Sequence, residues 1–199
     1  MMNLLRLMLV LGAFLLISAC ASLSKSECDA GDWGKIGSKD GANGLLAEKQ
    51  LNKHRSACAK HQKTPNREVY FSGHKEGLKR FCVNKVGFNH GFSGSEYFAN
   101  CPASLEKQFL TGYIPGLEAA IDDLAYEIQE LRHKRHRTNR RLDALYHVKK
   151  KPKDHKKRIG ILNSRLSIAK THIFSKRDEV AKLRAWRSFS LSRLSQLAK

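Results

Sequence analysis

The amino-acid sequence predicts an all-α protein: a small disulfide-linked helical domain followed by a long basic antiparallel helical hairpin or coiled coil. Three observations support this prediction. Three segments carry glycines four residues apart, four cysteines follow an N-terminal export signal, and two apolar seams of helical spacing follow residue 116. We expect a signal peptide at 1–19, the cysteine-containing domain at 20–116 and the basic hairpin at 117–199.

The first twenty residues have the layout of a secretory signal. Arg6 precedes an apolar run over residues 7–17, and small residues follow at once. The run is shorter than the about 20 apolar residues that a transmembrane helix needs. The segment LISAC at residues 16–20 resembles the lipobox of bacterial lipoproteins, which implies cleavage after Ala19 and acylation of Cys20. The alternative is an ordinary secreted protein whose cysteine lies there by chance.

The lipobox also implies where the protein resides. Bacterial lipoproteins carry more than one acyl chain, which is enough for stable anchoring. Ala21 follows the cysteine where an Asp would favour retention at the inner membrane. By resemblance to known sorting rules, we expect a lipid anchor in the outer membrane, with the protein facing the periplasm. Residues 21–27 are expected to form a short tether.

Besides the lipidated Cys20, the mature chain keeps four cysteines: Cys28, Cys58, Cys82 and Cys101. An even number in an exported protein predicts two disulfides, with three possible connectivities. In the nearest-neighbour choice, Cys28–Cys58 and Cys82–Cys101, each bridge is worth roughly 3–4 kcal/mol on the loop-entropy model. Zinc binding is the competing interpretation, but no pair has the CxxC spacing and the compartment is oxidising. We expect no metal and no cofactor.

Three segments in the middle of the chain share one glycine pattern. They are DWGKIGSKDGANG with Gly37 and Gly41, VYFSGHKEGLKRF with Gly73 and Gly77, and FLTGYIPGLEA with Gly112 and Gly116. Glycines at this spacing lie on one face of a helix and let a second backbone approach closely. The motif also pairs membrane helices, but these segments are too polar for lipid. We interpret them as a degenerate internal repeat of closely packed helices.

Local signals place the elements between these segments. Residues 46–61 form a plausible amphipathic helix, and Thr64 with Pro65 suits the start of the next one. The glycine-rich stretch 83–94 is expected to be a loop. Pro102 can open the third glycine-containing helix, whereas Pro115 inside it predicts a kink or a break.

Two apolar seams follow residue 116. Their residues recur at steps of four and three: Leu117, Ile121, Leu124, Ile128, Leu131, Leu142 and Leu145 first, then Ile159, Leu162, Leu166, Ala169, Ile173, Val180, Leu183, Leu194 and Leu197. The segment KKKPKDHKK separates them, so the pattern predicts an antiparallel hairpin. Arg135, Lys176 and Arg187 occupy seam positions and weaken it.

The formal net charge of +19 is concentrated near the expected hairpin tip. Residues 132–158 contain thirteen Lys or Arg against two acids, Asp143 and Asp154. The hypothetical anion-binding residues are Arg132, Lys134, Arg135, Arg137, Arg140, Arg141, Lys149, Lys150, Lys151, Lys153, Lys156, Lys157 and Arg158. Their field attracts anions over a Debye length, about 8–10 Å at physiological salt. In the periplasm these are lipid headgroups, anionic envelope polymers and acidic proteins, and the export signal argues against nucleic acid.

An ordered series of motifs resembles a known family. GDWGKIGSKDGANG, HRSACAKHQ, VYFSGHKEGLKRFC, GFNHGFSGSEYFANCP and FLTGYIPGL follow the lipobox in that order. Together they resemble the bacterial lipoproteins catalogued as domain of unknown function 2799, over roughly residues 1–120. The resemblance implies a small exported lipoprotein domain and brings no activity, ligand or catalytic residue. The hairpin extends beyond that pattern.

Catalytic chemistry has little support in the sequence. Asp40 and Glu76 occupy equivalent repeat positions and could converge, as the carboxylates of glycosidases do. Exposed acids beside lysines are the better interpretation. His54, His61, His74 and His90 show no metal-binding spacing. We therefore expect no catalytic residues and a protein that is not an enzyme.

Three function classes remain. We favour a structural or interaction lipoprotein of the cell envelope, anchored in the membrane, whose basic hairpin contacts anionic envelope components or a periplasmic protein. The alternative is an inhibitor or immunity protein against an envelope-attacking enzyme. The third is a cell-wall hydrolase, for which the sequence offers only the Asp40 and Glu76 pair.

Overall fold

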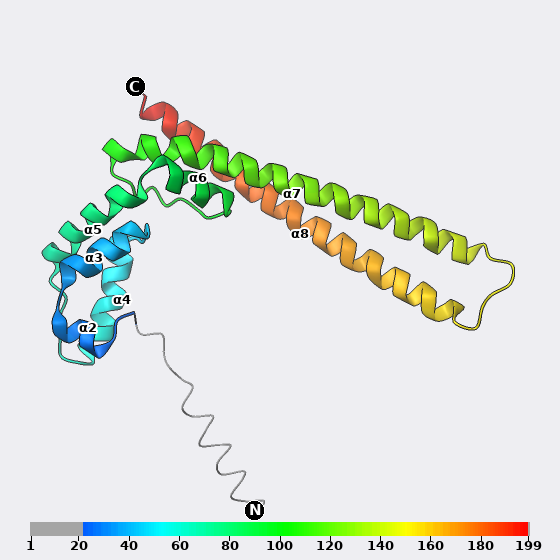
Figure 1. The fold of residues 1–199 in the computed structure, drawn as a ribbon, viewed down its shortest axis with the longest axis horizontal. Helices are drawn as coiled ribbons and strands as arrows, with labels where there is room; N and C mark the ends of the chain where they lie inside the picture. Colours follow the sequence, from blue (N-terminus) through cyan, green and yellow to red (C-terminus); the bar gives the residue numbers. More distant parts are fainter. Residues whose placement is uncertain (1–21, 199) are drawn as a thin grey trace, which may run out of the picture. The chain divides into compact units, whose positions relative to one another are not determined.

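The computed structural model describes residues 22–198, which form seven helices and no strand (Figure 1). The signal segment, the lipobox with Cys20, and Lys199 lie outside these residues. The expected all-α fold is confirmed. The chain divides into two compact units, one ending at Arg80 and the other beginning at Phe81. Residues 116 and 117, between which we expect the hairpin to begin, both lie within the helix Ala103–Tyr146.

The first unit contains four helices: α2 (Lys25–Ala30), α3 (Trp33–Ala42), α4 (Ala47–Ala59) and α5 (Arg67–Phe81), the last of which ends at the unit boundary. Side chains cap three of them. Ser24 and Glu27 form a reciprocal capping box at α2. Asp32 accepts a hydrogen bond from the Lys35 N–H at α3, and Asn66 accepts one from the Val69 N–H at α5. The cap of α5 is therefore Asn66 rather than the expected Thr64.

Helices α3 and α5 pack backbone to backbone through glycines. A Cβ atom added at Gly37, Gly41, Gly73 or Gly77 would lie closer than 3.0 Å to a backbone carbonyl oxygen of the other helix. No real Cβ fits at such a distance, so only glycine permits this approach. The interpretation of these two segments as close-packing helices is confirmed.

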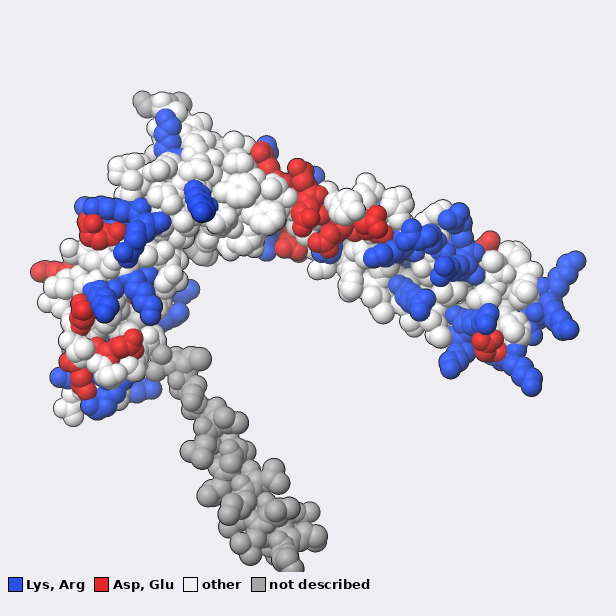
Figure 2. All heavy atoms as spheres, in the orientation of Figure 1, with Lys and Arg blue, Asp and Glu red and all other residues white. Residues whose placement is uncertain are grey.

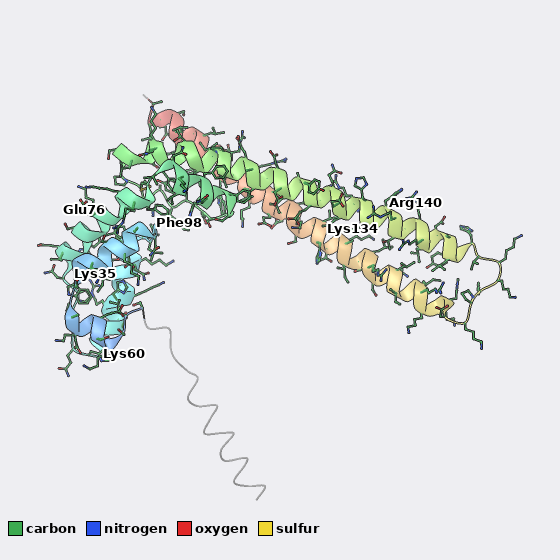
Figure 3. The ribbon with its side chains drawn as sticks, in the orientation of Figure 1. Lys35, Lys60, Glu76, Phe98, Lys134 and Arg140 are labelled. Atoms are coloured by element: carbon green, nitrogen blue, oxygen red, sulfur yellow. A yellow bond between two sulfur atoms is a disulfide. The ribbon has the colours of Figure 1, made fainter. Side chains whose placement is uncertain are left out.

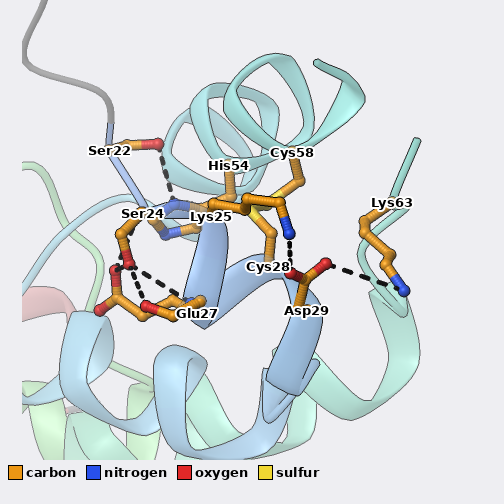
Figure 4. Close-up of a disulfide and its surroundings, with 10 residues drawn as sticks. Ser22, Ser24, Lys25, Glu27, Cys28, Asp29, His54, Cys58 and Lys63 are labelled. Atoms are coloured by element: carbon orange, nitrogen blue, oxygen red, sulfur yellow. Dashed lines mark hydrogen bonds and ion pairs between the residues drawn. A yellow bond between two sulfur atoms is a disulfide. The ribbon is translucent and has the colours of Figure 1, made fainter. Parts of the chain in front are cut away.

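The N-terminal part of the first unit is folded, not a tether. Leu23 is 7% exposed and joins an apolar cluster with Cys28, Trp33, Leu51, Cys58 and Tyr70. The Cys28–Cys58 disulfide lies in this cluster and links α2 to α4 (Figure 4). The expected tether over residues 21–27 is therefore wrong for residues 22–27, because the capping box starts α2 and Leu23 is buried.

The second unit contains three helices: α6 (Asn84–Phe92), α7 (Ala103–Tyr146) and α8 (His155–Gln196). Helix α6 occupies the stretch expected to be a loop. Its Gly87 and Gly91 form a fourth GxxxG, which packs against Gly112 and Gly116 of α7 in the same way that α3 packs on α5. Each helical glycine costs about 1 kcal/mol relative to Ala. Close packing offsets that cost, which is why the loop expectation failed.

Helix α7 begins after Pro102, as expected, and continues through Pro115 to residue 146. Of the kink or break expected at Pro115, the break is absent. The Cys82–Cys101 disulfide connects the segment before α6 to the segment before α7. Both bridges have the nearest-neighbour connectivity expected from the sequence.

Helices α7 and α8 lie side by side as an antiparallel pair (Figure 1). Their buried seam consists of Leu117, Ile121, Leu124 and Ile128 of α7 and Leu166, Ile173, Val180 and Leu183 of α8. The cations expected to weaken the seam are partly compensated, since Lys176 pairs with Glu127 and Arg187 with Glu118 across the two helices. Within residues 22–198, no helix is long and apolar enough to cross a bilayer.

Candidate anion-binding site

The antiparallel hairpin brings the cations of two helices and one loop to the same end of the second unit. We call residues 132–158 the basic end; it comprises the last turns of α7, the connecting loop and the first turn of α8. Eleven of its thirteen Lys and Arg residues are exposed, and Arg132 and Arg135 are half-buried. Figure 2 shows these cations gathered around the loop end of the hairpin, and Figure 3 labels Lys134 and Arg140 among them.

The two acids of the basic end bind local partners. Asp143 lies 3.4 Å from His147 Nε2, and Asp154 Oδ2 accepts a hydrogen bond of 2.7 Å from Arg158 Nε. That hydrogen bond lowers the pKa of Asp154. Each acid therefore sits beside one basic side chain, and twelve of the thirteen Lys and Arg have no ion pair to an acid within the described residues.

The placement of these cations does not follow from helix stability. Helix α8 begins with Lys156 and Lys157 in its first turn and has no acid there. Cations at a helix N-terminus oppose the helix dipole, typically by about 0.3–1 kcal/mol each. A first turn that served only to stabilise α8 would carry Asp or Glu. Lys156 and Lys157 therefore do not stabilise α8 through its helix dipole.

Charge is also segregated along α7. Five acids lie on the stretch of α7 just before the basic end: Glu118, Asp122, Asp123, Glu127 and Glu130. Figure 2 shows acidic side chains gathered on this middle stretch of the hairpin and basic ones beyond it. Two of the acids are used by the cross-helix ion pairs with Lys176 and Arg187. Along α7, the cations are therefore concentrated toward the loop end of the hairpin.

One buried histidine also lies in the basic end. His155, the first residue of α8, is 8% exposed, and its Nδ1 has no hydrogen-bond partner among the described residues. Nothing in the sequence pattern distinguishes this histidine from the exposed ones nearby.

The first unit holds a separate buried polar network. Asp40 Oδ2 accepts a hydrogen bond of 2.7 Å from Tyr70 OH and lies 2.7 Å from His54 Nε2. His54 Nδ1 lies 3.1 Å from Ser22 Oγ, as Figure 4 shows. Burial and the hydrogen bond to Asp40 both raise the pKa of Tyr70. The network attaches the residue two positions after Cys20 to the core of the unit.

This network has the residue types of a Ser-His-Asp triad but not its wiring. In serine hydrolases the nucleophile faces Nε2 and the carboxylate faces Nδ1. In this protein the two ring nitrogens are exchanged, and His54 is only 2% exposed. A third group, Tyr70, also donates to the carboxylate. We therefore assign the network a structural role, fixing the N-terminal segment.

Asp40 and Glu76, which the sequence suggested as a possible carboxylate pair, do not lie together. Asp40 is buried in the network, whereas the side chain of Glu76 is 60% exposed and pairs with Lys79. His74 bonds to the Leu45 carbonyl oxygen and His90 to the Glu96 carbonyl oxygen. These residues act locally and do not converge on one site.

Comparison with known proteins gives one match, to a protein family. Residues 32–118 match the model of a family described as a protein of unknown function (DUF2799). Over these residues the chain is similar to that family. The matched region contains both glycine-packed helix pairs, α3 with α5 and α6 with the start of α7. The basic end lies outside the matched region. No curated protein and no solved structure matches the chain.

Proposed function

We propose that this chain is a lipid-anchored envelope protein that acts by binding rather than by catalysis. Acylated Cys20 holds it at the outer membrane on the periplasmic side, and the basic end of the hairpin contacts an anionic membrane surface. The observation that carries the proposal is the charge imbalance of the basic end, thirteen cations against two locally paired acids. Cations in the first turn of α8, where they oppose the helix dipole, add support.

The fold of the N-terminal segment limits how far the first unit can lie from a lipid on Cys20. Ser22 is hydrogen-bonded to His54, and Leu23 is buried in the apolar cluster. Only Ala21 separates Ser22 from Cys20, and two residues of extended chain reach at most about 7 Å. A lipid on Cys20 would therefore hold the first unit close to the bilayer surface. The anchor itself is inferred from the lipobox alone.

The energetics of the basic end suit a membrane surface. A basic residue near an anionic leaflet contributes about 1 kcal/mol, so several acting together give useful affinity without a specific pocket. Exposed charges are screened beyond about 8 Å at physiological ionic strength. Binding of this kind must therefore weaken steeply as salt is added.

Vesicle sedimentation of the mature chain carrying Cys20→Ser tests the proposal. Removing the acyl chains leaves the hairpin as the source of affinity. We expect the bound fraction to rise with the content of anionic phospholipid and to fall between low and physiological salt. Equal binding to neutral and anionic vesicles, or binding that is indifferent to salt, would overturn the proposal.

A further inference from the structure

An open groove runs between α7 and α8 at the basic end. Its volume is about 390 Å³, and it is lined by Arg141, Ala144, Leu145, Arg158, Ile161, Leu162 and Arg165. Small-molecule sites typically measure about 300–1,000 Å³ and combine an apolar lining with a few placed polar groups. The groove has this composition, because four apolar residues alternate with three arginines.

The groove exists because the hairpin seam loosens toward its loop. The seam residues of α7 from Leu117 to Ile128 are buried, whereas Leu145 and Leu162 are only half-buried. Ile161 is 43% exposed. Apolar surface left in water is unfavourable, and a hydrocarbon chain in the groove would cover it.

The three arginines around the groove are available to bind an anion. Within the described residues no ion pair joins Arg141 or Arg165 to an acid, and Arg158 pairs only with Asp154, one turn away. Arginine presents a planar fork of donors that matches the oxygens of a phosphate. A ligand that complements both parts of the groove carries a phosphate and an apolar chain.

We propose that this groove binds one anionic phospholipid, with an acyl chain on the apolar lining and the phosphate held by Arg141, Arg158 and Arg165. The inference rests on the proposed function and deepens it, since it replaces a diffuse surface attraction by a saturable site for a single lipid. The basic end then binds one lipid specifically, in addition to its electrostatic attraction to the membrane surface.

The direct test uses lipids that dissolve as monomers. Binding of dihexanoyl phosphatidic acid to the mature chain with Cys20→Ser is measured by calorimetry, beside glycerol 3-phosphate and dihexanoyl phosphatidylcholine. The first comparison compound lacks the chains and the second lacks the net negative charge. We expect saturable one-to-one binding of phosphatidic acid, at least tenfold tighter than either comparison compound. Equal affinity for phosphatidic acid and glycerol 3-phosphate would overturn the proposal of a phospholipid site in the groove.

Two matched pairs of variants locate the site. Ala144→Phe fills the groove and should weaken phosphatidic acid binding at least tenfold, whereas Ala125→Phe, also at an exposed position of α7 but outside the groove, should leave it unchanged. Should Ala144→Phe disturb the fold, the double change Arg141→Gln with Arg165→Gln serves instead. Its control, Lys150→Gln with Lys151→Gln, removes the same charge from the loop. Equal losses within either pair would overturn the proposal.

The two proposals fail in different ways. Ala144→Phe leaves every charge in place, so salt-dependent vesicle binding should persist in it. If vesicle binding by the parent is normal while no dissolved lipid binds, the groove is wrong and the electrostatic account stands. If dissolved phosphatidic acid binds but anionic vesicles do not, the membrane contact is wrong and the groove stands.

Discussion

Glu106 and Arg193, which are 87 positions apart in the sequence, form a two-pronged ion pair where α7 begins and α8 ends. Arg193 Nε and Nη2 donate hydrogen bonds of 2.9–3.2 Å to the Glu106 carboxylate, which is 1% exposed. The hydrogen bond to Glu106 raises the pKa of Arg193. A heptad seam alone permits the helices to slip by seven residues. Slippage would leave the buried carboxylate without its cation, so this pair favours one register.

Removing the cation of this pair should destabilise the second unit. Arg193→Leu leaves a buried carboxylate unpaired, so we expect a clear fall in the urea midpoint of unfolding. Arg187→Leu removes a cation from the pair with Glu118, whose side chain is 45% exposed, and should shift the midpoint much less. Adding Glu106→Leu to Arg193→Leu should restore part of the stability. Equal effects of the two arginine changes would refute the register role.

The glycines of α6 and α7 should resist even a methyl group. Gly91→Ala places its Cβ against the backbone at Tyr113 and Leu117, so we expect a loss of about 1–3 kcal/mol in the free energy of unfolding. Gly160→Ala meets nothing within 4 Å and should stabilise α8 by about 0.5–1 kcal/mol, because alanine is the better helix former. Chemical denaturation of both variants checks this. Two changes of the same sign would contradict the close packing of α6.

The four cysteines that follow Cys20 should be fully oxidised. Non-reducing peptide mapping of material from the periplasm should recover Cys28 linked to Cys58 and Cys82 linked to Cys101. Two or more free thiols would refute the two-disulfide framework. A crossed connectivity would refute only the pairing.

The membrane anchor should depend on one residue. Cys20→Ser abolishes the acylation that the lipobox implies, so the protein should leave the outer-membrane fraction when salt removes any electrostatic contact. The parent protein should remain in that fraction under the same wash. A Cys20→Ser protein held as firmly as the parent would contradict lipidation at this position.

The elements most visible in the sequence were those that depend on local pattern. The apolar seams of α7 and α8 and three of the four GxxxG segments follow helical spacing, and the structure places them on packed faces. Two misread segments carried usable local signals. The spacing of Gly87 and Gly91 equals that of the other pairs, and Ser24 with Glu27 is a visible capping box.

Other features depend on contacts between distant residues and leave no local trace. Glu106 and Arg193 are 87 positions apart, so nothing near either residue predicts that they meet. Asp40, His54 and Tyr70 come from three different helices, and their network depends on how α3, α4 and α5 pack. To predict the lipid groove from the sequence, one would need to know where the apolar seam between α7 and α8 becomes less buried. The cations of the basic end, by contrast, were identifiable from composition alone.

The most direct test of the central claim compares two charge-matched variants in vesicle binding. One changes Lys149, Lys150, Lys151, Lys156 and Lys157 of the basic end to Gln, and the other changes five exposed lysines of the first unit, Lys35, Lys39, Lys49, Lys53 and Lys75, to Gln. Both lower the net charge equally. If the basic end is the contact surface, the first variant loses binding to anionic vesicles at low salt while the second keeps most of it. Equal losses, or intact binding of the first variant, would contradict the account.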